Sequence, residues 1–410
     1  MEITDVKTVL LTGPSGNDPF LQSLRKLRSA AFIEIHTDTE LVGIGETYTG
    51  YHAPEIVPEI VDFFKPILVG IQEAEVEPRQ LWQLMYHCGN FWARTGVGVN
   101  VLAGIEAALW DLKGKMLGVP VHQLLGGRLH DRLFCYATGA ASNYPWSDLI
   151  RKFELYREAG FAAAKVGAGW HNVETGDSFR SRSTAAWVDM ETEKLEAVRQ
   201  QFGGDLTVCL DGHMSNKEND AAAKWDVGIA KAVLQALEPF DLFFFEEPLH
   251  YNDLDGYAEL CANTAVPVAG GECLSTREEF RQYADRRAFD IAQPDAAYIG
   301  MAAFLDVARM FAAQGKRVAT HSWASGAGQM QNIHAAFATP NMAILEIPPL
   351  AGPLHTEIYA DGGFRFQDGY MLPPEAPGLG VRLTDDIKER FPFERGSGEW
   401  SNVRGKGRCK

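Results

Sequence analysis

Basic residues are scarce in this chain of 410 residues: 38 lysines and arginines stand against 54 aspartates and glutamates, a formal net charge of -16. This balance argues against nucleic acid or an anionic membrane surface as a partner, because both attract basic proteins. The N-terminus lacks the basic and apolar regions of a secretion signal, and no apolar run reaches membrane-spanning length. The six cysteines show no Cys-x-x-Cys spacing and Asn-x-Ser/Thr acceptors are absent, so we expect a cytoplasmic protein.

The first 125 residues have the pattern of an α+β domain. Strands are expected at residues 3–11 and 31–37, with a turn at Gly43-Ile-Gly45. Helices are expected at residues 54–65 and 99–117, the second ending at Gly118-Val-Pro120. A chain of this length usually exceeds one hydrophobic core, so either a barrel with additions or two domains is expected.

From Leu133 onward, short apolar runs alternate with segments of helical length. This pattern favours an α/β fold, a (β/α)8 barrel over residues 126–350. Residues 170–187 are predicted to form a loop over its mouth. Residues 351–395 are expected to return to the N-terminal domain, and residues 396–410 to form a flexible tail. The eight strands are predicted to end near Thr138, Gly167, Asp211, Glu246, Gly271, Gln293, Thr320 and Glu346.

Three consecutive predicted strands end in an acid: Asp211, Glu246 and Glu272. The carboxyl ends of barrel strands meet at one mouth, so the three carboxylates are expected to converge and to hold a divalent cation, Mg2+. Each acid taken alone is equally consistent with a helix cap or a surface salt bridge. Glu247 adjoins Glu246, and only one of the two can point inward on a regular strand.

Other strand ends carry residues suited to proton transfer. Lys165 is expected to neutralise a substrate carboxylate or to transfer a proton with a lowered pKa, unless it extends to water. Asp295 is expected to hold one imidazole nitrogen of His321, leaving the other as a general base near neutral pH. The alternative is a helix-capping aspartate and a structural core histidine.

Two further residues are candidates with open roles. Glu346 would stabilise an oxyanion if it stays protonated, or would form a buried ion pair with Lys165 or an arginine. His213, two residues after Asp211, is a second acid or base, or a surface loop histidine.

Several motifs together resemble the enolase superfamily, mandelate racemase subgroup, with likeness to acid-sugar dehydratases. The resemblance implies a capping domain made of N-terminal and C-terminal segments, a modified barrel, and one Mg2+ per subunit on Asp211, Glu246 and Glu272. It also implies removal of the proton α to a metal-bound carboxylate, and a homo-oligomer. The motifs are Ala107-Ala-Leu-Trp-Asp-Leu-Lys-Gly114, Val119-Pro-Val-His-Gln-Leu-Leu-Gly-Gly127, Glu246-Glu-Pro248, Gly271-Glu272, Gln293-Pro-Asp295 and His321.

One departure from the family pattern narrows the reaction. Many members carry Lys-x-Lys on the second strand, whereas this chain has Lys165-Val-Gly167. Racemisation needs proton exchange on both faces of the carbon, but elimination of water proceeds with one base and one acid. The sequence therefore favours a dehydratase that converts an aldonic or aldaric acid to a 2-keto-3-deoxy acid.

The sequence is also consistent with two other functions. An epimerase, racemase or cycloisomerase would need a base such as His171 or Arg180 from the loop, and a non-catalytic barrel would only bind a metabolite. In the family, two capping-domain loops choose the substrate; here they are residues 13–26 and residues 47–55, which include His52. The sequence identifies no individual substrate-binding residue.

Overall fold

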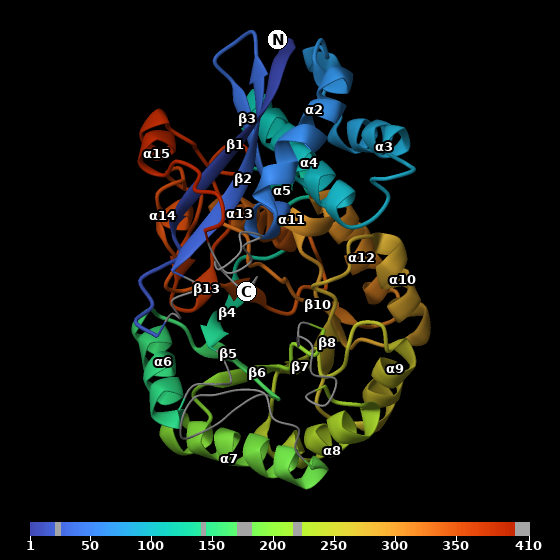
Figure 1. Cartoon of the computed structure of the whole chain (residues 1–410), viewed down its shortest axis with the longest axis vertical. Helices are drawn as coiled ribbons and strands as arrows, with labels where there is room; N and C mark the ends of the chain where they lie inside the picture. Colours follow the sequence, from blue (N-terminus) through green and yellow to red (C-terminus); the bar gives the residue numbers. More distant parts are fainter. Residues whose placement is uncertain (21–25, 141–144, 170–182, 216–223, 398–410) are drawn as a thin grey trace.

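The computed structural model describes residues 1–20, 26–140, 145–169, 183–215 and 224–397. In Figure 1 the N-terminal strands and helices lie at the top, above a ring of strands surrounded by helices α6 to α10 and α12. Among the described residues, no helix is long and apolar enough to cross a bilayer.

The N-terminal part is an antiparallel three-stranded sheet with helices packed on it. Its strands are β1 (Ile3–Pro14), β2 (Leu27–Thr37) and β3 (Val42–Thr47), with β2 in the middle. Gly45 allows close packing, since a Cβ there would lie 2.2 Å from the carbonyl oxygen of Gly104 in the long helix α4. The remaining elements are α1 (Thr49–His52), η2 (Pro54–Ile56), α2 (Val57–Leu68), η3 (Glu73–Glu75), α3 (Pro78–Cys88), α4 (Val97–Leu117) and α5 (Val121–Leu125).

The barrel contains the eight predicted strands. Strands β4 to β10 pair in chain order as parallel neighbours, β11 pairs with β4, and a bridge between Val318 and Met342 joins the ends of the ring. The strands are β4 (Leu133–Ala140), β5 (Ala163–Gly167), β6 (Thr207–Asp211), β7 (Phe244–Glu246), β8 (Val268–Gly270), β9 (Ile291–Ala292), β10 (Arg317–Val318) and β11 (Leu345–Ile347).

Each of the first seven strands is followed by a helix of ten residues or more, whereas β11 is followed by the four-residue helix α14 (Pro353–Thr356). The barrel is therefore of the modified type. The helices are α6 (Trp146–Glu158), α7 (Thr184–Phe202), α8 (Val227–Leu237), α9 (Leu254–Asn263), α10 (Arg277–Arg286), α12 (Met301–Ala312) and α13 (Gly326–Phe337), with the short η5 (Glu238–Phe240) and α11 (Ala296–Ile299) between them.

The predicted mouth loop at residues 170–187 is wrong at its C-terminal end. Helix α7 begins at Thr184, because the side chain of Ser183 accepts a hydrogen bond from the amide of Ala186 and caps the helix. Residues 170–182, which include His171 and Arg180, lie outside the described residues.

An apolar layer closes the barrel interior. It contains one buried or partly buried side chain from each strand or the residue next to it: Tyr136, Ala163, Cys209, Phe244, Ala269, Ile291, Ala319 and Ile344. Because side chains alternate along a strand, this layer fixes which residues face the barrel axis further along every strand.

The C-terminal segment contacts both parts of the molecule. Leu11 of β1 is bridged to Pro392, and α14 and α15 (Asp385–Arg390) lie beside β1 and β2 in Figure 1. The hairpin of β12 (Phe366–Gln367) and β13 (Tyr370–Met371) pairs instead with barrel strand β4, through Tyr370 and Phe134. Of the predicted tail, residues 398–410 lie outside the described residues.

Asp111 of α4 joins three segments of the molecule. Its buried carboxylate accepts hydrogen bonds from the amides of Ile44 at 2.7 Å and Leu379 at 2.6 Å, and it pairs with Lys115 at 2.6 Å. We expect Asp111→Ala to lower the free energy of unfolding by about 3–5 kcal/mol, because the buried amides and the ammonium lose their partner. Urea-induced unfolding followed by circular dichroism measures the change.

The matched control is Asp131→Ala, since the Asp131 side chain is 96% exposed and pairs only loosely with Arg128. That change should shift stability by less than about 0.5 kcal/mol. Equal unfolding midpoints for the two variants would contradict the structural importance assigned to Asp111.

Candidate active site

A polar layer lies directly above the apolar layer of the barrel. Moving two residues along each strand keeps a side chain on the same face. The residues two positions beyond the apolar layer are Thr138, Lys165, Asp211, Glu246, Gly271, Gln293, His321 and Glu346. Five of the predicted site residues therefore face the same mouth of the barrel, because each lies two positions beyond the apolar layer: Lys165, Asp211, Glu246, His321 and Glu346.

Lys165 lies at the centre of the acids. Its ammonium nitrogen is 2.8 Å from Asp211 Oδ2, 2.6 Å from Glu246 Oε2 and 3.2 Å from Glu346 Oε1. Burial opposes the charged form, but these carboxylates outweigh it and hold the pKa of Lys165 well above its usual value. The direction of this shift contradicts the expectation of a lowered pKa, and the contacts favour the ammonium form of Lys165.

Glu346 forms the buried ion pair that was one of its two predicted roles. Its Oε2 also accepts a hydrogen bond of 2.6 Å from the amide of Ser322. Burial raises the pKa of Glu346, but the charges of Lys165 and His321 and hydrogen bonds from Thr138 and Ser322 lower it overall. The protonated form that the oxyanion role required is therefore disfavoured.

His321 and Asp295 form a hydrogen-bonded pair. The Nδ1 atom of His321 lies 2.8 Å from Asp295 Oδ2, and Nε2 lies 3.6 Å from Glu272 Oε2. Asp295 also caps α11, because its Oδ1 accepts a hydrogen bond from the amide of Ala297. The pairing expected from the sequence and its helix-cap alternative are both present.

The charge state of His321 differs from the expectation of a pKa near neutral. Burial lowers the pKa, but the hydrogen bond to Asp295 and the charges of Glu272 and Glu346 raise it to about 10. A cation bound among the neighbouring acids would cancel part of this negative charge and shift the imidazole back towards its neutral form.

The three acids predicted to bind metal do not all point at one spot. Oxygen atoms of Asp211 and Glu272 and a ring nitrogen of His213 lie within 4.8 Å of one another. Glu246 lies opposite Asp211 in the strand register, but its Oε2 faces Lys165.

A divalent cation nevertheless fits this set of side chains. The other oxygen of Glu246, Oε1, is buried and has no hydrogen-bond partner within the described residues. Burial and the charge of Asp211 raise the pKa of Glu246 to about 8. Carboxylate oxygens that crowd and repel one another in this way are the hard ligands that Mg2+ prefers.

His213 reaches the acids through a turn rather than a continued strand. Strand β6 ends at Asp211, and His213 has a φ of 45°. Both its amide, at 3.1 Å, and its Nδ1 atom, at 3.0 Å, contact Asp211 Oδ1. The side chain is 36% exposed, so the imidazole lies at the open side of the cluster. Its role as an acid or base stays a prediction.

Glu247 was expected to point away from the site, but its carboxylate is buried beside Glu272 and Cys273. Strand β7 ends at Glu246, and Glu247 has a φ of 40°. Alternation no longer applies in a left-handed turn, so both glutamates come close to the cluster. Strand periodicity alone therefore could not predict that Glu247 lies beside the cluster.

Sequence reasoning also missed three other buried residues around the site. Gln293 belongs to the polar layer, and its amide has no hydrogen-bond partner within the described residues; the two-residue periodicity could have identified it. Asn332 of α13 donates a 2.8 Å hydrogen bond to Asp295. The ring of Tyr48, from the capping-domain loop at residues 47–55, meets His321 edge-on at a centroid distance of 5.5 Å.

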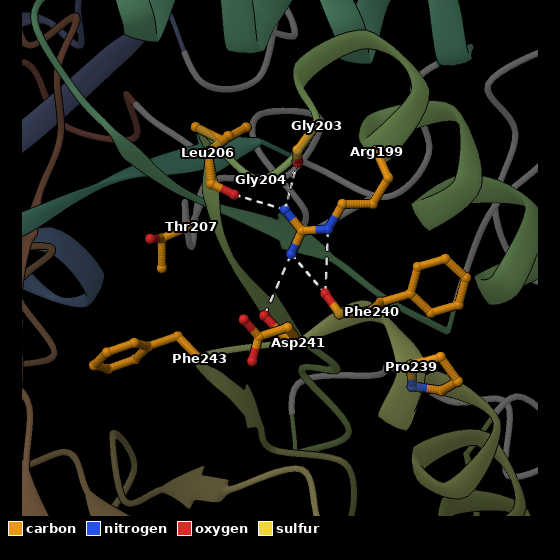
Figure 2. A pocket seen from close by; sticks show the side chains of 9 residues that line it. All are labelled: Arg199, Gly203, Gly204, Leu206, Thr207, Pro239, Phe240, Asp241 and Phe243. Atoms are coloured by element: carbon orange, nitrogen blue, oxygen red, sulfur yellow. Dashed lines mark hydrogen bonds between the residues drawn. The ribbon is translucent and has the colours of Figure 1, made fainter.

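A pocket at the opposite end of the barrel is structural (Figure 2). It surrounds the starts of β6 and β7, where the guanidinium of Arg199 donates to the carbonyl oxygens of Leu206 at 2.7 Å and Phe240 at 2.6 Å. Functional residues of such barrels lie at the carboxyl ends of the strands, so this pocket is not the candidate site.

The fold and the site together define a class: a capped β/α barrel with a cluster of acids, a lysine and a His–Asp pair at its mouth. Residues 148–387 match the family described as "Enolase C-terminal domain-like", and residues 8–126 match "Mandelate racemase / muconate lactonizing enzyme, N-terminal domain". The chain belongs to the enolase superfamily, in its mandelate racemase subgroup.

Individual relatives carry different activities. A D-galactonate dehydratase of Ralstonia nicotianae is 30% identical over 382 residues, which cover 90% of this chain and 92% of the relative. The crystal structure of a 3,6-anhydro-D-galactonate cycloisomerase from Zobellia galactanivorans has a TM-score of 0.80 and 26% identity, covering 96% of this chain and all of that one. A Streptomyces coelicolor racemase with bound magnesium has a TM-score of 0.78 and 25% identity, covering 95% of this chain and 99% of that one.

Mg2+ should stabilise the folded protein through Asp211 and Glu272. A ligand at a hundred times its Kd stabilises by about 2.7 kcal/mol, so the Tm should rise on addition of Mg2+. The double variant Asp211→Asn/Glu272→Gln should lose this rise, measured by differential scanning calorimetry.

Asp241→Asn is the matched control, since it removes a carboxylate from the opposite end of the barrel. Asp241 has a φ of 50°, which asparagine also tolerates. A rise in Tm that persists in the double variant would place the ion elsewhere.

Proposed function

We propose that this protein is a Mg2+-dependent sugar-acid dehydratase, a hydro-lyase that converts an aldonic or aldaric acid to a 2-keto-3-deoxy acid. The observation that carries the proposal is the His321–Asp295 pair, whose free nitrogen faces the carboxylate cluster at 3.6 Å from Glu272. The D-galactonate dehydratase of Ralstonia nicotianae, which is 30% identical to this chain, supports the substrate class. One Mg2+ per subunit, a homo-oligomer and a cytoplasmic location stay predictions.

His321 would begin the reaction as the general base. Asp295 holds Nδ1, so Nε2 is left to take the proton from the carbon next to the substrate carboxylate. Mg2+ held by Asp211, Glu246 and Glu272 would stabilise the negative charge that develops on that carboxylate. Lys165 adds a fixed positive charge in a buried site, where it acts more strongly than in water.

Loss of the hydroxyl group completes the elimination. The carbon–oxygen bond at C3 breaks, and the leaving hydroxide takes a proton to become water. Two groups could supply that proton: His321, which holds the proton taken from C2, or His213 at the open side of the cluster. The enol formed at C2 and C3 then becomes the 2-keto-3-deoxy acid.

Racemisation or epimerisation is less well supported by the residues on β5. Gly167 stands where a second lysine would provide a base on the opposite face. Lys194 of α7 lies near this strand end, but its ammonium is held by Glu191 Oε2 at 2.5 Å and by the carbonyl oxygen of Gly167 at 2.8 Å. Cycloisomerisation remains the second candidate, because the structural relative from Zobellia galactanivorans is a cycloisomerase.

A substrate panel in D2O tests the reaction type directly. We expect a 2-keto-3-deoxy product from at least one aldonic or aldaric acid of four to six carbons in the presence of Mg2+, detected by NMR. Deuterium at C2 with inversion would instead identify an epimerase, and conversion of a cyclic sugar acid or lactone added to the panel into an open-chain isomer would identify a cycloisomerase. If no compound in the panel is converted, the result counts against the dehydratase, the epimerase and the cycloisomerase.

His321→Asn should lower kcat by about 10²–10⁴-fold, the usual contribution of a general base. Affinity for Mg2+ should stay within a few-fold, because His321 is not one of the proposed ligands. Calorimetric titration of the ion and steady-state kinetics measure the two effects. His130→Asn is the control, since His130 contacts the carbonyl oxygen of Thr339 and no site residue within the described part of the chain; activity near wild type in His321→Asn would remove the residue from its role.

A further inference from the structure

Helix α13 connects the capping domain to the His321–Asp295 pair. It begins five residues after His321, and all twelve of its residues are buried. It carries Asn332 close to Asp295, and its first turn meets Glu46 of the capping-domain strand β3.

Asn332 fixes the Asp295 carboxylate on the side away from His321. Its Nδ2 atom donates to Asp295 Oδ1 at 2.8 Å, and its Oδ1 atom accepts from the amide of Ala296 at 2.8 Å. The same amide group lies 3.3 Å from the hydroxyl of Ser322, the residue after His321. The Asn332 side chain therefore holds both the Asp295 carboxylate and the backbone amide of the next residue. It also contacts Ser322, the residue that follows His321.

Orientation of the carboxylate decides where the imidazole points. Asp295 Oδ2 binds His321, whereas Oδ1 is held by Asn332 and by the amide of Ala297. With Asn332 removed, Oδ1 keeps a single donor and the carboxylate gains freedom to rotate about its Cβ–Cγ bond. A reacting group displaced by about 1 Å can lose a factor of 10² in rate.

Glu46 supplies the cap of α13 from the other domain. The helix N-cap residue, Ser325, makes no side-chain capping bond. Glu46 Oε1 instead accepts from the amide of Ser325 and Oε2 from the amide of Gly328, each at 2.8 Å. The amide of Glu46 donates to Gln331 on the same helix at 2.9 Å. A carboxylate suits this position, because the first amides of a helix lack partners and carry partial positive charge.

We propose that Asn332 is a positioning residue for the His321–Asp295 pair, and that Glu46 couples docking of the capping domain to this pair by fixing the start of α13. The inference rests on the proposed function in its assignment of His321 as the base. It adds two residues, one in each domain, that touch no substrate and act through another side chain.

Asn332→Leu tests the first part, since leucine has a similar volume and no hydrogen-bonding atoms. In the folded variant we expect kcat to fall about 10–100-fold, with KM changed by less than about threefold because the substrate contacts remain. The primary deuterium isotope effect, measured with substrate deuterated at C2, should rise as proton transfer becomes slower. Loss of folded protein alone would lower the apparent kcat and leave the isotope effect unchanged.

Asn341→Leu is the matched control. Asn341 donates to the carbonyl oxygens of Ala308 at 3.1 Å and Lys316 at 3.0 Å, next to the start of β10 and away from the mouth. Its replacement should lower stability without changing the isotope effect. If Asn332→Leu does not fold, Asn332→Ser removes the same amide with a smaller change.

The second part is tested by Glu46→Gln, which puts an amide donor against a helix amide. We expect the same changes in kcat and isotope effect as for Asn332→Leu, but smaller, with a decrease in kcat of about 3–10-fold. Glu106→Gln is its control, because Glu106 of α4 accepts from the amide of Ala302 in α12, a helix that carries none of the site residues.

Histidine-selective 15N NMR provides a readout that needs no substrate. The His321 Nδ1 resonance is identified by its loss in His321→Asn, and it should shift in the folded Asn332 variant and in Glu46→Gln but not in either control. A shifted resonance together with a lower kcat supports the inference, and any other combination in a folded variant overturns it. If the substrate panel finds no substrate, the proposed function fails by itself, and an unshifted resonance would still overturn the role of Asn332.

Discussion

Charge balance around Lys165 is the interaction on which the rest of the site depends. One buried ammonium contacts three carboxylates from three different strands, and a fourth acid, Glu272, lies close by. Removal of several charges from water costs a great deal unless they are paired. Burial raises the pKa of Asp211 and of Glu346, but the charges of His213 and Lys165 lower that of Asp211 overall, and the charges of Lys165 and His321 lower that of Glu346. The pKa of Glu246 is raised to about 8 by burial and its acidic neighbours. The cluster still carries an excess of negative charge, which is the electrostatic condition for binding a divalent cation.

The barrel provides this arrangement through its packing. A layer of apolar side chains fills the interior, and the residues two positions further along each strand form the polar layer above it. The apolar layer excludes water from below, so the charges act in a medium of low polarity. The same alternation that allows the barrel to fold thus determines which residues can take part in chemistry.

The capping domain completes the mouth from the other side. Tyr48 packs against His321, and Glu46 caps α13, the barrel helix that follows His321 in the chain. Asp111 ties the long helix α4 to β3 and to the C-terminal segment near Leu379. In our proposal the orientation of the imidazole depends on residues separated by more than 200 positions in the chain. It also depends on docking of the two parts, whose facing apolar residues, such as Ile44 and Ala107 of the N-terminal part, belong to the same core cluster as the barrel residues.

The amino-acid sequence alone determined the eight-stranded barrel and the N-terminal α+β part. It also placed six site residues within a few positions of the C-terminal ends of the strands: Lys165, Asp211, Glu246, Asp295, His321 and Glu346. These features depend on hydrophobic periodicity and on the rule that parallel strands end at one mouth, and both are local properties of the chain. The choice of Glu246 over Glu247 as a metal ligand came only from the family resemblance.

Tertiary structure decided the charge states and the turns. The pKa of Lys165 is raised and that of Glu346 is lowered because charges from distant strands surround them. Left-handed turns after β6 and β7 bring His213 and Glu247 to the cluster, where strand alternation gives no guidance. Asn332 and Glu46 were not predictable, because their partners are fixed by helix docking. Electrostatic fields and contacts between separate elements depend on all the neighbours at once, and a linear pattern records only the residues next to each other in the chain.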